Sequence, residues 1–116
     1  IILTMNLLSK KCVPCEGGVP SMTRKDANEM LKQVRGWEVF DDGAVLKIRK
    51  LYKFETYMDG IAFVNKIAEL AEDEGHHPNL DVGYAKVAVT LWTHAIDGLS
   101  DNDFILAAKA DRLNEK

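Results

Sequence analysis

The spacing of apolar side chains changes between helical and strand periodicity along this chain, and that pattern constrains the fold more than any other feature. Over residues 24–35, apolar side chains recur three and four positions apart, as on one face of a helix. Residues 37–40 and 44–53 instead alternate apolar and polar side chains, which is typical of half-buried strands. Asp41-Asp42-Gly43 lies between these two runs and predicts a hairpin turn.

A second helix and a second pair of extended segments follow in the C-terminal half. The amphipathic pattern that starts after Thr56 ends at Gly75, a residue suited to a left-handed helix cap. Extended segments are predicted around residues 80–84 and at 86–93. His94 is predicted to continue one face of the latter segment, because side chains alternate along a strand.

The last helix is predicted to begin at Ser100, where Asp103 three positions later completes a capping box. The element order is then α-β-β-α-β-β-α, with the strands in pairs between helices. This order predicts an α+β fold, in which helices cover one face of an antiparallel sheet. We expect residues 1–22 to be an irregular N-terminal segment and residues 23–116 to form one domain.

Composition and charge exclude several classes of protein. The chain has 116 residues, 47% of them hydrophobic, which suits one compact core. Its net charge of −3 is spread along the chain, which argues against a nucleic-acid partner. Charged residues interrupt every apolar stretch before the ~20 residues that a membrane span requires. Without a recognisable secretory signal, a cytoplasmic location is the default expectation.

The two cysteines lie in the sequence Cys12-Val-Pro-Cys15, whose spacing suits a redox pair or half of a zinc site. A second pair of zinc ligands is missing from the neighbourhood. No strand pattern precedes the motif, as one would in a thioredoxin-like protein. An inert N-terminal segment, a redox pair and a metal half-site all remain open.

All three histidines, His76, His77 and His94, fall within one short stretch of the chain. Imidazole titrates near neutral pH, so they form a candidate acid–base set. His76 and His77 precede a proline, which favours extended backbone and points adjacent side chains in opposite directions. That arrangement is poor for sharing one metal ion, so we expect no metal, and a three-histidine zinc site is the minor alternative. A polar connection and an exposed strand end would explain the same residues without catalysis.

Three acidic residues, Glu72, Asp73 and Glu74, end the helix that precedes the histidines. Negative charge is unfavourable at a helix C-terminus because of the helix dipole. We therefore expect these carboxylates to have a partner or a function.

The spacing of these residues resembles the signature of the pterin-4a-carbinolamine dehydratases, also known as the dimerisation-cofactor family. The similarity extends from about Thr23 to Asp111, and the pattern consists of Glu72-xxx-His76-His77-Pro78, Tyr84, His94 and Asp103, with Gly36-Trp37 and Gly98-Leu99-Ser100. Residues 11–18 also look like the leader of some microbial and plant members.

This resemblance implies a four-stranded antiparallel sheet with helices on one face, assembled as a homodimer or homotetramer. The family dehydrates 4a-hydroxytetrahydropterin to quinonoid dihydropterin. Hydroxide leaves C4a badly unless it is protonated, and N5 loses its proton as the C4a=N5 bond forms. Acid–base residues meet both needs, so the reaction requires no metal, redox cofactor or covalent nucleophile, and we expect no cofactor.

By resemblance, the catalytic residues are His76, His77 and His94. His76 and His94 would donate protons to the hydroxyl on either face of the substrate, and His77 would chiefly hold the pterin. The pterin ring would also contact three further residues, namely Gly75, Trp92 and Thr93. Trp92 is bulkier than the small residue found there in animal members, and Trp37 is expected in the core.

Two carboxylates are predicted to support the histidines. Glu72 lies one helical turn before His76 and would orient it or raise its basicity, unless it is only a solvated surface carboxylate. Asp103 would help hold His94, although helix capping alone explains its position.

Two other functions share these residues. One is a non-catalytic oligomeric binding or coactivator module, and the other is dehydration of a different pterin, including one related to molybdopterin.

Overall fold

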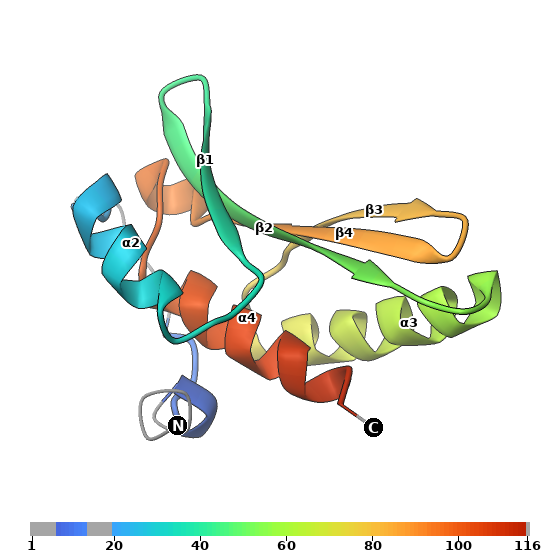
Figure 1. Cartoon of the computed structure of the whole chain (residues 1–116). Coiled ribbons are helices and arrows are strands. Elements are labelled where there is room, and N and C mark those ends of the chain that lie inside the picture. Colours follow the sequence, from blue (N-terminus) through green and yellow to red (C-terminus); the bar gives the residue numbers. More distant parts are fainter. Residues whose placement is uncertain (1–6, 14–19, 116) are drawn as a thin grey trace.

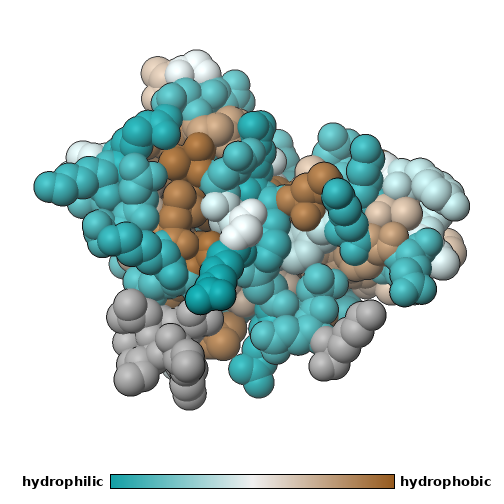
Figure 2. All heavy atoms as spheres, viewed as in Figure 1, coloured by the Kyte–Doolittle hydropathy of each residue, from teal (hydrophilic) through white to brown (hydrophobic). Residues whose placement is uncertain are grey.

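The computed structural model describes residues 7–13 and 20–115, and its four strands form one antiparallel sheet in the order β1-β2-β4-β3. Helices α3 and α4 run along one face of this sheet (Figure 1). The predicted α+β architecture is confirmed. Figure 2 shows that hydrophilic residues cover most of the face in view, with a strip of apolar residues between α2 and β1.

Helix α2 spans Arg24–Leu31, and its N-cap Thr23 accepts a hydrogen bond from the Asp26 N–H. The helix is shorter than the predicted 24–35. After Leu31 the N–H groups of residues 32–34 bond to carbonyls three positions back, which tightens the last turn. Val34 keeps its place in the apolar pattern and is buried, although it lies beyond the helix.

The first hairpin consists of β1 (Glu38–Asp42) and β2 (Val45–Lys53). The predicted hairpin is confirmed, but its turn is shorter than expected. Asp42 pairs with Val45, so the turn is Gly43 and Ala44, and Gly43 takes the positive φ of 64°.

The second hairpin consists of β3 (Asn79–Gly83) and β4 (Lys86–Leu91). Tyr84 lies in the turn rather than in the predicted strand 80–84, and its side chain is exposed. The predicted strand 86–93 ends early, at Leu91. Thr93 forms an isolated bridge with Gly98, and this loop replaces the last two strand positions.

His94 therefore does not continue the strand face. It begins a short 3₁₀ helix, η1 (His94–Ile96), which the bridge between Thr93 and Gly98 closes. The prediction of strand alternation through His94 was wrong, because alternation cannot foresee where a strand leaves the sheet.

The hydrophobic core lies between the sheet and its helices. Its sheet face includes Ile48, Val87, Val89 and Leu91, all 1% exposed or less. Helix α3 (Tyr57–Glu74) begins at the Thr56 cap and ends at Gly75, as predicted. Helix α4 (Asp101–Leu113) has the predicted capping box of Ser100 and Asp103, and most of its side chains are buried.

Trp37 is buried, as expected for a core residue, and its indole N–H donates to the Asp111 carboxylate. The same carboxylate binds Lys50 Nζ at 2.8 Å and accepts a hydrogen bond from the Tyr52 hydroxyl. Burial, followed by the charge of Asp111, raises the pKa of Tyr52. This cluster ties the far end of α4 to β2.

In the described part of the N-terminal segment, a short helical turn stands where the sequence predicted irregular structure. Residues 7–9 are helical, and Leu7 is 1% exposed within the core. Cys15 lies outside the described residues. Among the helices of residues 7–13 and 20–115, none is long and apolar enough to cross a membrane.

Candidate active site

Gly75 places the first histidine of the site. It ends α3 with a φ of 66°, a left-handed conformation that glycine adopts without strain. The His76 N–H then donates to the Ala71 carbonyl at 3.2 Å, which folds the chain back over the end of the helix. This turn brings the His76 ring to the start of α4.

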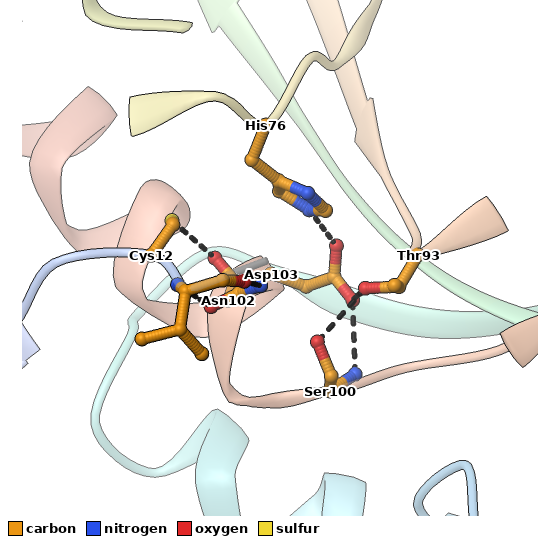
Figure 3. Close-up of polar contacts among 7 residues, drawn as sticks. Cys12, His76, Thr93, Ser100, Asn102 and Asp103 are labelled. Carbon is orange, nitrogen blue, oxygen red and sulfur yellow. Dashed lines mark hydrogen bonds and ion pairs between the residues drawn. The ribbon is translucent and has the colours of Figure 1, made fainter. Parts of the chain in front are cut away.

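Asp103 is the centre of the site, and its side chain is fully buried. Its Oδ1 lies 2.6 Å from Nε2 of His76. Its Oδ2 accepts hydrogen bonds from the Ser100 N–H at 3.0 Å and the Thr93 hydroxyl at 2.9 Å (Figure 3). The Thr93 and Ser100 hydroxyls are also 2.8 Å apart. The carboxylate thus joins the end of α3, the segment after β4 and the start of α4.

The predicted pairing of Asp103 with His94 was wrong, because Asp103 binds His76. Asp103 lies in the first turn of α4, and the turn at Gly75 brings His76 to the carboxylate oxygen that does not cap the helix. The alternative role as a helix cap is confirmed, so one side chain does both.

The predicted pairing of Glu72 with His76 was also wrong, because Glu72 Oε2 lies 2.5 Å from His77 Nε2. The prediction assumed that helical spacing continues past the end of α3. The left-handed turn at Gly75 breaks that spacing and places His77 over the last helical turn. Both side chains are largely exposed, so the pair adds little to stability.

His94 is linked to the site by its peptide bond to Thr93, and not by a hydrogen bond to another histidine. It directly follows Thr93, whose hydroxyl donates a hydrogen bond to Asp103 Oδ2. The His94 ring packs against Trp92, with ring centroids 4.4 Å apart and planes inclined at 47°. Lys47 Nζ lies 3.7 Å from the centroid of the same indole. Trp92 therefore fixes one side of the exposed His94 ring.

The three residues expected to contact the pterin lie around these histidines. Gly75 is exposed and Trp92 is half-buried, whereas Thr93 is buried. The Thr93 N–H donates to the Gly98 carbonyl at 2.8 Å, so its backbone already takes part in the loop. A depression lined by Pro78, Asn79, Leu80, Asp81 and Thr90 begins at the residue that follows His77 in the chain. Pterin contact at these positions stays a prediction.

The His76–Asp103 pair can transfer protons. A carboxylate only accepts hydrogen bonds, so Nε2 of His76 donates to it, and Nδ1 is the nitrogen that gains or loses a proton. Within the described parts of the chain, no three His, Cys, Asp or Glu side chains are grouped so that they could hold a metal ion.

Glu74 confirms that the acidic end of α3 has partners. Its carboxylate accepts hydrogen bonds from Lys109 Nζ at 2.6 Å and from the Cys12 N–H at 2.8 Å. Burial alone would raise the pKa of Glu74, but these two donors and the charge of Lys109 together hold it below its ordinary value.

Cys12 is half-buried, and its Sγ lies 3.6 Å from the Asn102 carbonyl. Burial and the neighbouring Glu74 charge raise the pKa of Cys12 to about 12. A reactive thiol needs a lowered pKa, so the environment of Cys12 does not favour a redox role.

Sequence reasoning missed Asn102 and Lys47. Asn102 forms two hydrogen bonds with the backbone of Val13, and Lys47 lies over Trp92. Neither residue stands at a spacing that would have singled it out. The one signal in the sequence was that Asn102 immediately precedes Asp103.

Comparisons with known proteins identify the relatives of this chain. The family model described as pterin 4 alpha carbinolamine dehydratase matches residues 20–113. A protein of Rickettsia bellii, provisionally named a pterin-4-alpha-carbinolamine dehydratase, is 47% identical over 112 residues, covering 96% of each chain. The mitochondrial pterin-4-alpha-carbinolamine dehydratase 2 of Arabidopsis thaliana is 43% identical over 110 residues, covering 93% of this chain and 59% of the plant protein.

Two solved structures are similar in fold. The transcriptional coactivator/pterin dehydratase of Brucella melitensis superposes with a TM-score of 0.75 at 29% identity, covering 82% of this chain and 99% of that one. A pterin dehydratase-like protein, identified as a RuBisCO assembly factor in the α-carboxysome, gives a TM-score of 0.58 at 29% identity, covering 68% and 89%. From the family match, the identities and their coverage, the chain belongs to the pterin-4a-carbinolamine dehydratase family of hydro-lyases.

Proposed function

We propose that this chain dehydrates 4a-hydroxytetrahydropterin to quinonoid dihydropterin and water, with His76 and His94 transferring protons and His77 holding the pterin. Family membership supports the reaction. The observation that carries the assignment of residues is the 2.6 Å contact between His76 Nε2 and the buried Asp103, next to the Thr93–His94 step.

The reaction needs one proton delivered and one removed. The C4a–O bond breaks while the departing hydroxyl takes a proton and leaves as water. The N5–H bond gives up its proton, and its electron pair becomes the new C4a=N5 double bond. An imidazolium donates the first proton and a neutral imidazole accepts the second, so the two histidines together keep the same number of protons while their individual states are reversed.

His76 and His94, the two proposed proton-transfer residues, lie in different environments. His76 has an 11% exposed side chain, and the buried Asp103 carboxylate holds its ring in place. His94 is exposed and held by packing against Trp92. His77 is exposed and paired with Glu72, and this exposure leaves it accessible to a substrate.

The test is an assay on freshly generated 4a-hydroxytetrahydropterin, followed by its ultraviolet absorbance change. Wild-type protein is expected to accelerate the dehydration over buffer, and His76→Ala combined with His94→Ala is expected to remove most of that acceleration. An acceleration that survives the double substitution would overturn the assignment of residues. Running the assay with several pterins, including a molybdopterin-related one, identifies the preferred substrate.

A binding role is the second candidate. The solved structures with this fold include one named a transcriptional coactivator/pterin dehydratase and one identified as a RuBisCO assembly factor. A stoichiometric protein partner that co-purifies with an inactive wild-type protein would favour this role over catalysis.

We also propose that the chain acts as a homodimer or homotetramer, in a cytoplasmic setting. Among the described residues, β1 and β3 each pair with one strand only and form the edges of the sheet. Unpaired edges favour pairing with another chain. Val82 on β3 is 40% exposed, an apolar side chain that a second copy could cover. Light scattering coupled to size exclusion should give a mass of two or four chains, and a monomer would contradict the proposal.

A further inference from the structure

Residues 7–13, here called the N-terminal strap, lie against the end of α3 and the start of α4. Leu7 anchors the strap in the core. At its other end, the Val13 N–H donates to Asn102 Oδ1 at 3.0 Å, and Asn102 Nδ2 donates to the Val13 carbonyl at 2.7 Å. The Cys12 N–H donates to Glu74 Oε1 at 2.8 Å (Figure 3 shows the Asn102 side of these contacts).

The two residues that hold the strap lie close in the chain to His76 and Asp103. Glu74 is two positions before His76, and Asn102 is one position before Asp103. The strap thus grips both of the elements whose ends must meet for His76 Nε2 to reach Asp103 Oδ1. His76 and Asp103 stand at the ends of two different helices. The distance between His76 Nε2 and Asp103 Oδ1 therefore depends on how the end of α3 is placed against the start of α4.

The carboxylate of Glu74 completes this link. Its Oε2 binds Lys109 Nζ on α4 at 2.6 Å, while its Oε1 takes the strap N–H. The Glu74 side chain is 6% exposed and that of Lys109 is 16% exposed, so the ion pair is shielded from water. Negative charge at the C-terminus of α3 is otherwise unfavourable. A single carboxylate therefore joins α3, α4 and the strap beside the Gly75 turn.

We propose that the N-terminal strap is a positioning device for the active site: by joining Glu74 to Asn102, it fixes the end of α3 against the start of α4 and so holds His76 on Asp103. Asn102 and Glu74 are then positioning residues, because they touch the catalytic pair only through the backbone. The kinetic part of this inference rests on the proposed function, whereas its structural part does not.

The test substitution is Asn102→Ala, which removes both hydrogen bonds to Val13. The matched control is Tyr52→Phe, which removes one buried hydrogen bond from Asp111 at the opposite end of α4. Both changes weaken a polar contact of α4, but only the first lies beside the site. Denaturant unfolding of both variants shows whether each still folds and how much stability it loses.

The direct readout is the ring of His76 by ¹⁵N-detected NMR. The chain has three histidines, so single substitutions assign their signals. In the wild type, the His76 Nε2–H proton should be observable because the bond to Asp103 slows its exchange with water. Asn102→Ala should increase that exchange rate by about tenfold or more, whereas Tyr52→Phe should leave it within about twofold.

The kinetic readout is the dehydratase assay. Asn102→Ala should lower kcat by at least about tenfold with little change in KM, since a misplacement of 1 Å can cost ~100-fold. Tyr52→Phe should retain wild-type kcat. A His76 signal and a kcat that are unchanged in Asn102→Ala, or changed equally in both variants, would overturn the positioning role. If the wild type has no dehydratase activity, the NMR exchange rate alone decides whether the strap holds His76.

Discussion

The Asp103 carboxylate caps α4 with one oxygen and holds His76 with the other. These two tasks can be separated, because an amide oxygen also caps a helix but an amide cannot accept the His76 N–H with its nitrogen. The stability of the site and its chemistry therefore depend on different atoms of one side chain.

Asp103→Asn should lower kcat of the dehydratase by about 100-fold or more. The asparagine would bind Ser100 N–H with its oxygen and turn its NH₂ group toward His76, forcing the proton onto the wrong ring nitrogen. The same replacement in a serine-protease triad costs about 10⁴-fold for that reason. Steady-state kinetics measure the loss, and the free energy of unfolding should change by less than about 1 kcal/mol because asparagine is a good cap.

Ser100→Ala is the reciprocal control. It removes a helix-cap hydroxyl, which costs about 1 kcal/mol of stability, and leaves the His76–Asp103 contact in place. Its kcat should stay within a few fold of wild type. If Ser100→Ala lost as much activity as Asp103→Asn, general loosening of α4 would explain both effects.

Cys12 leads to a prediction at alkaline pH. Its pKa rises from 9.0 to about 12 in the folded protein, so the folded state prefers the neutral thiol. The resulting stabilisation is complete below pH 9 and is lost as the pH rises from 9 toward 12, because only the unfolded chain ionises there. In a Cys15→Ser background, Cys12 should react with a thiol reagent at pH 8 far more slowly in the folded than in the urea-unfolded protein. Equal reaction rates would show that the thiol is not protected.

The sequence singled out candidate residues for the site, but it did not predict how they pair. Spacing singled out Glu72, Asp103 and the three histidines, and the structure pairs His76 with Asp103 and His77 with Glu72. Both carboxylates have a different partner from the expected one, and for Glu72 the reason is that helical spacing stops at the left-handed Gly75. A turn of this kind changes which side chain faces the helix, and one sequence does not reveal the direction of that change.

At the scale of elements, Gly75 can be tested against a second glycine of the same conformation. Gly75 and Gly43 have φ values of 66° and 64°, and an added Cβ would meet no atom within 4 Å at either position. Alanine at each should therefore cost about 1 to 2 kcal/mol of stability through backbone strain alone. Only Gly75→Ala should also lower kcat, because His76 follows that turn.

Gly75→Asn should restore much of the loss, since asparagine tolerates the left-handed conformation. Chemical denaturation and steady-state kinetics on the three variants separate the two effects. Equal activity in Gly75→Ala and Gly43→Ala would mean that the α3 cap does not place His76.

Elements with a clear periodicity were predicted to within a few residues. The end of the last strand and the N-terminal strap were not, because contacts with distant parts of the fold, and not local periodicity, determine them. Helix α3 and both hairpins appear where the apolar pattern placed them. The strand that should reach residue 93 stops at Leu91, because Thr93 pairs with Gly98 instead. The strap was missed because Leu7 is anchored by tertiary contacts and belongs to no repeating pattern.

For the whole molecule, the sequence predicted which strands form hairpins but not how the hairpins join. The central contact of the sheet is β2 with β4, where Ile48 stands opposite Leu91. That pairing connects segments from both halves of the chain, and local patterns do not determine such long-range contacts. It matters for function, because it carries the Thr93–His94 segment to the end of α3.

The acid stability of the folded molecule should depend on Glu74. Its lowered pKa means that the folded state prefers the ionised carboxylate, so this contribution is present above the ordinary value of 4.5 and is lost as the pH falls through the lowered folded value. Glu74→Gln should lower the free energy of unfolding at pH 7 by about 1.5 to 3 kcal/mol, the range for a hydrogen bond to a charged group. The deficit relative to wild type should shrink as the pH falls below about 4.5, since protonation removes the same charge from the wild type. Urea unfolding at pH 7, 5, 4 and 3 measures this convergence.

Glu29→Gln is the control, because Glu29 forms an exposed ion pair with Lys32 and its substitution should change stability little at any pH. A Glu74→Gln deficit that stays constant down to pH 3 would show that its hydrogen-bond geometry, and not its charge, joins the strap to the two helices.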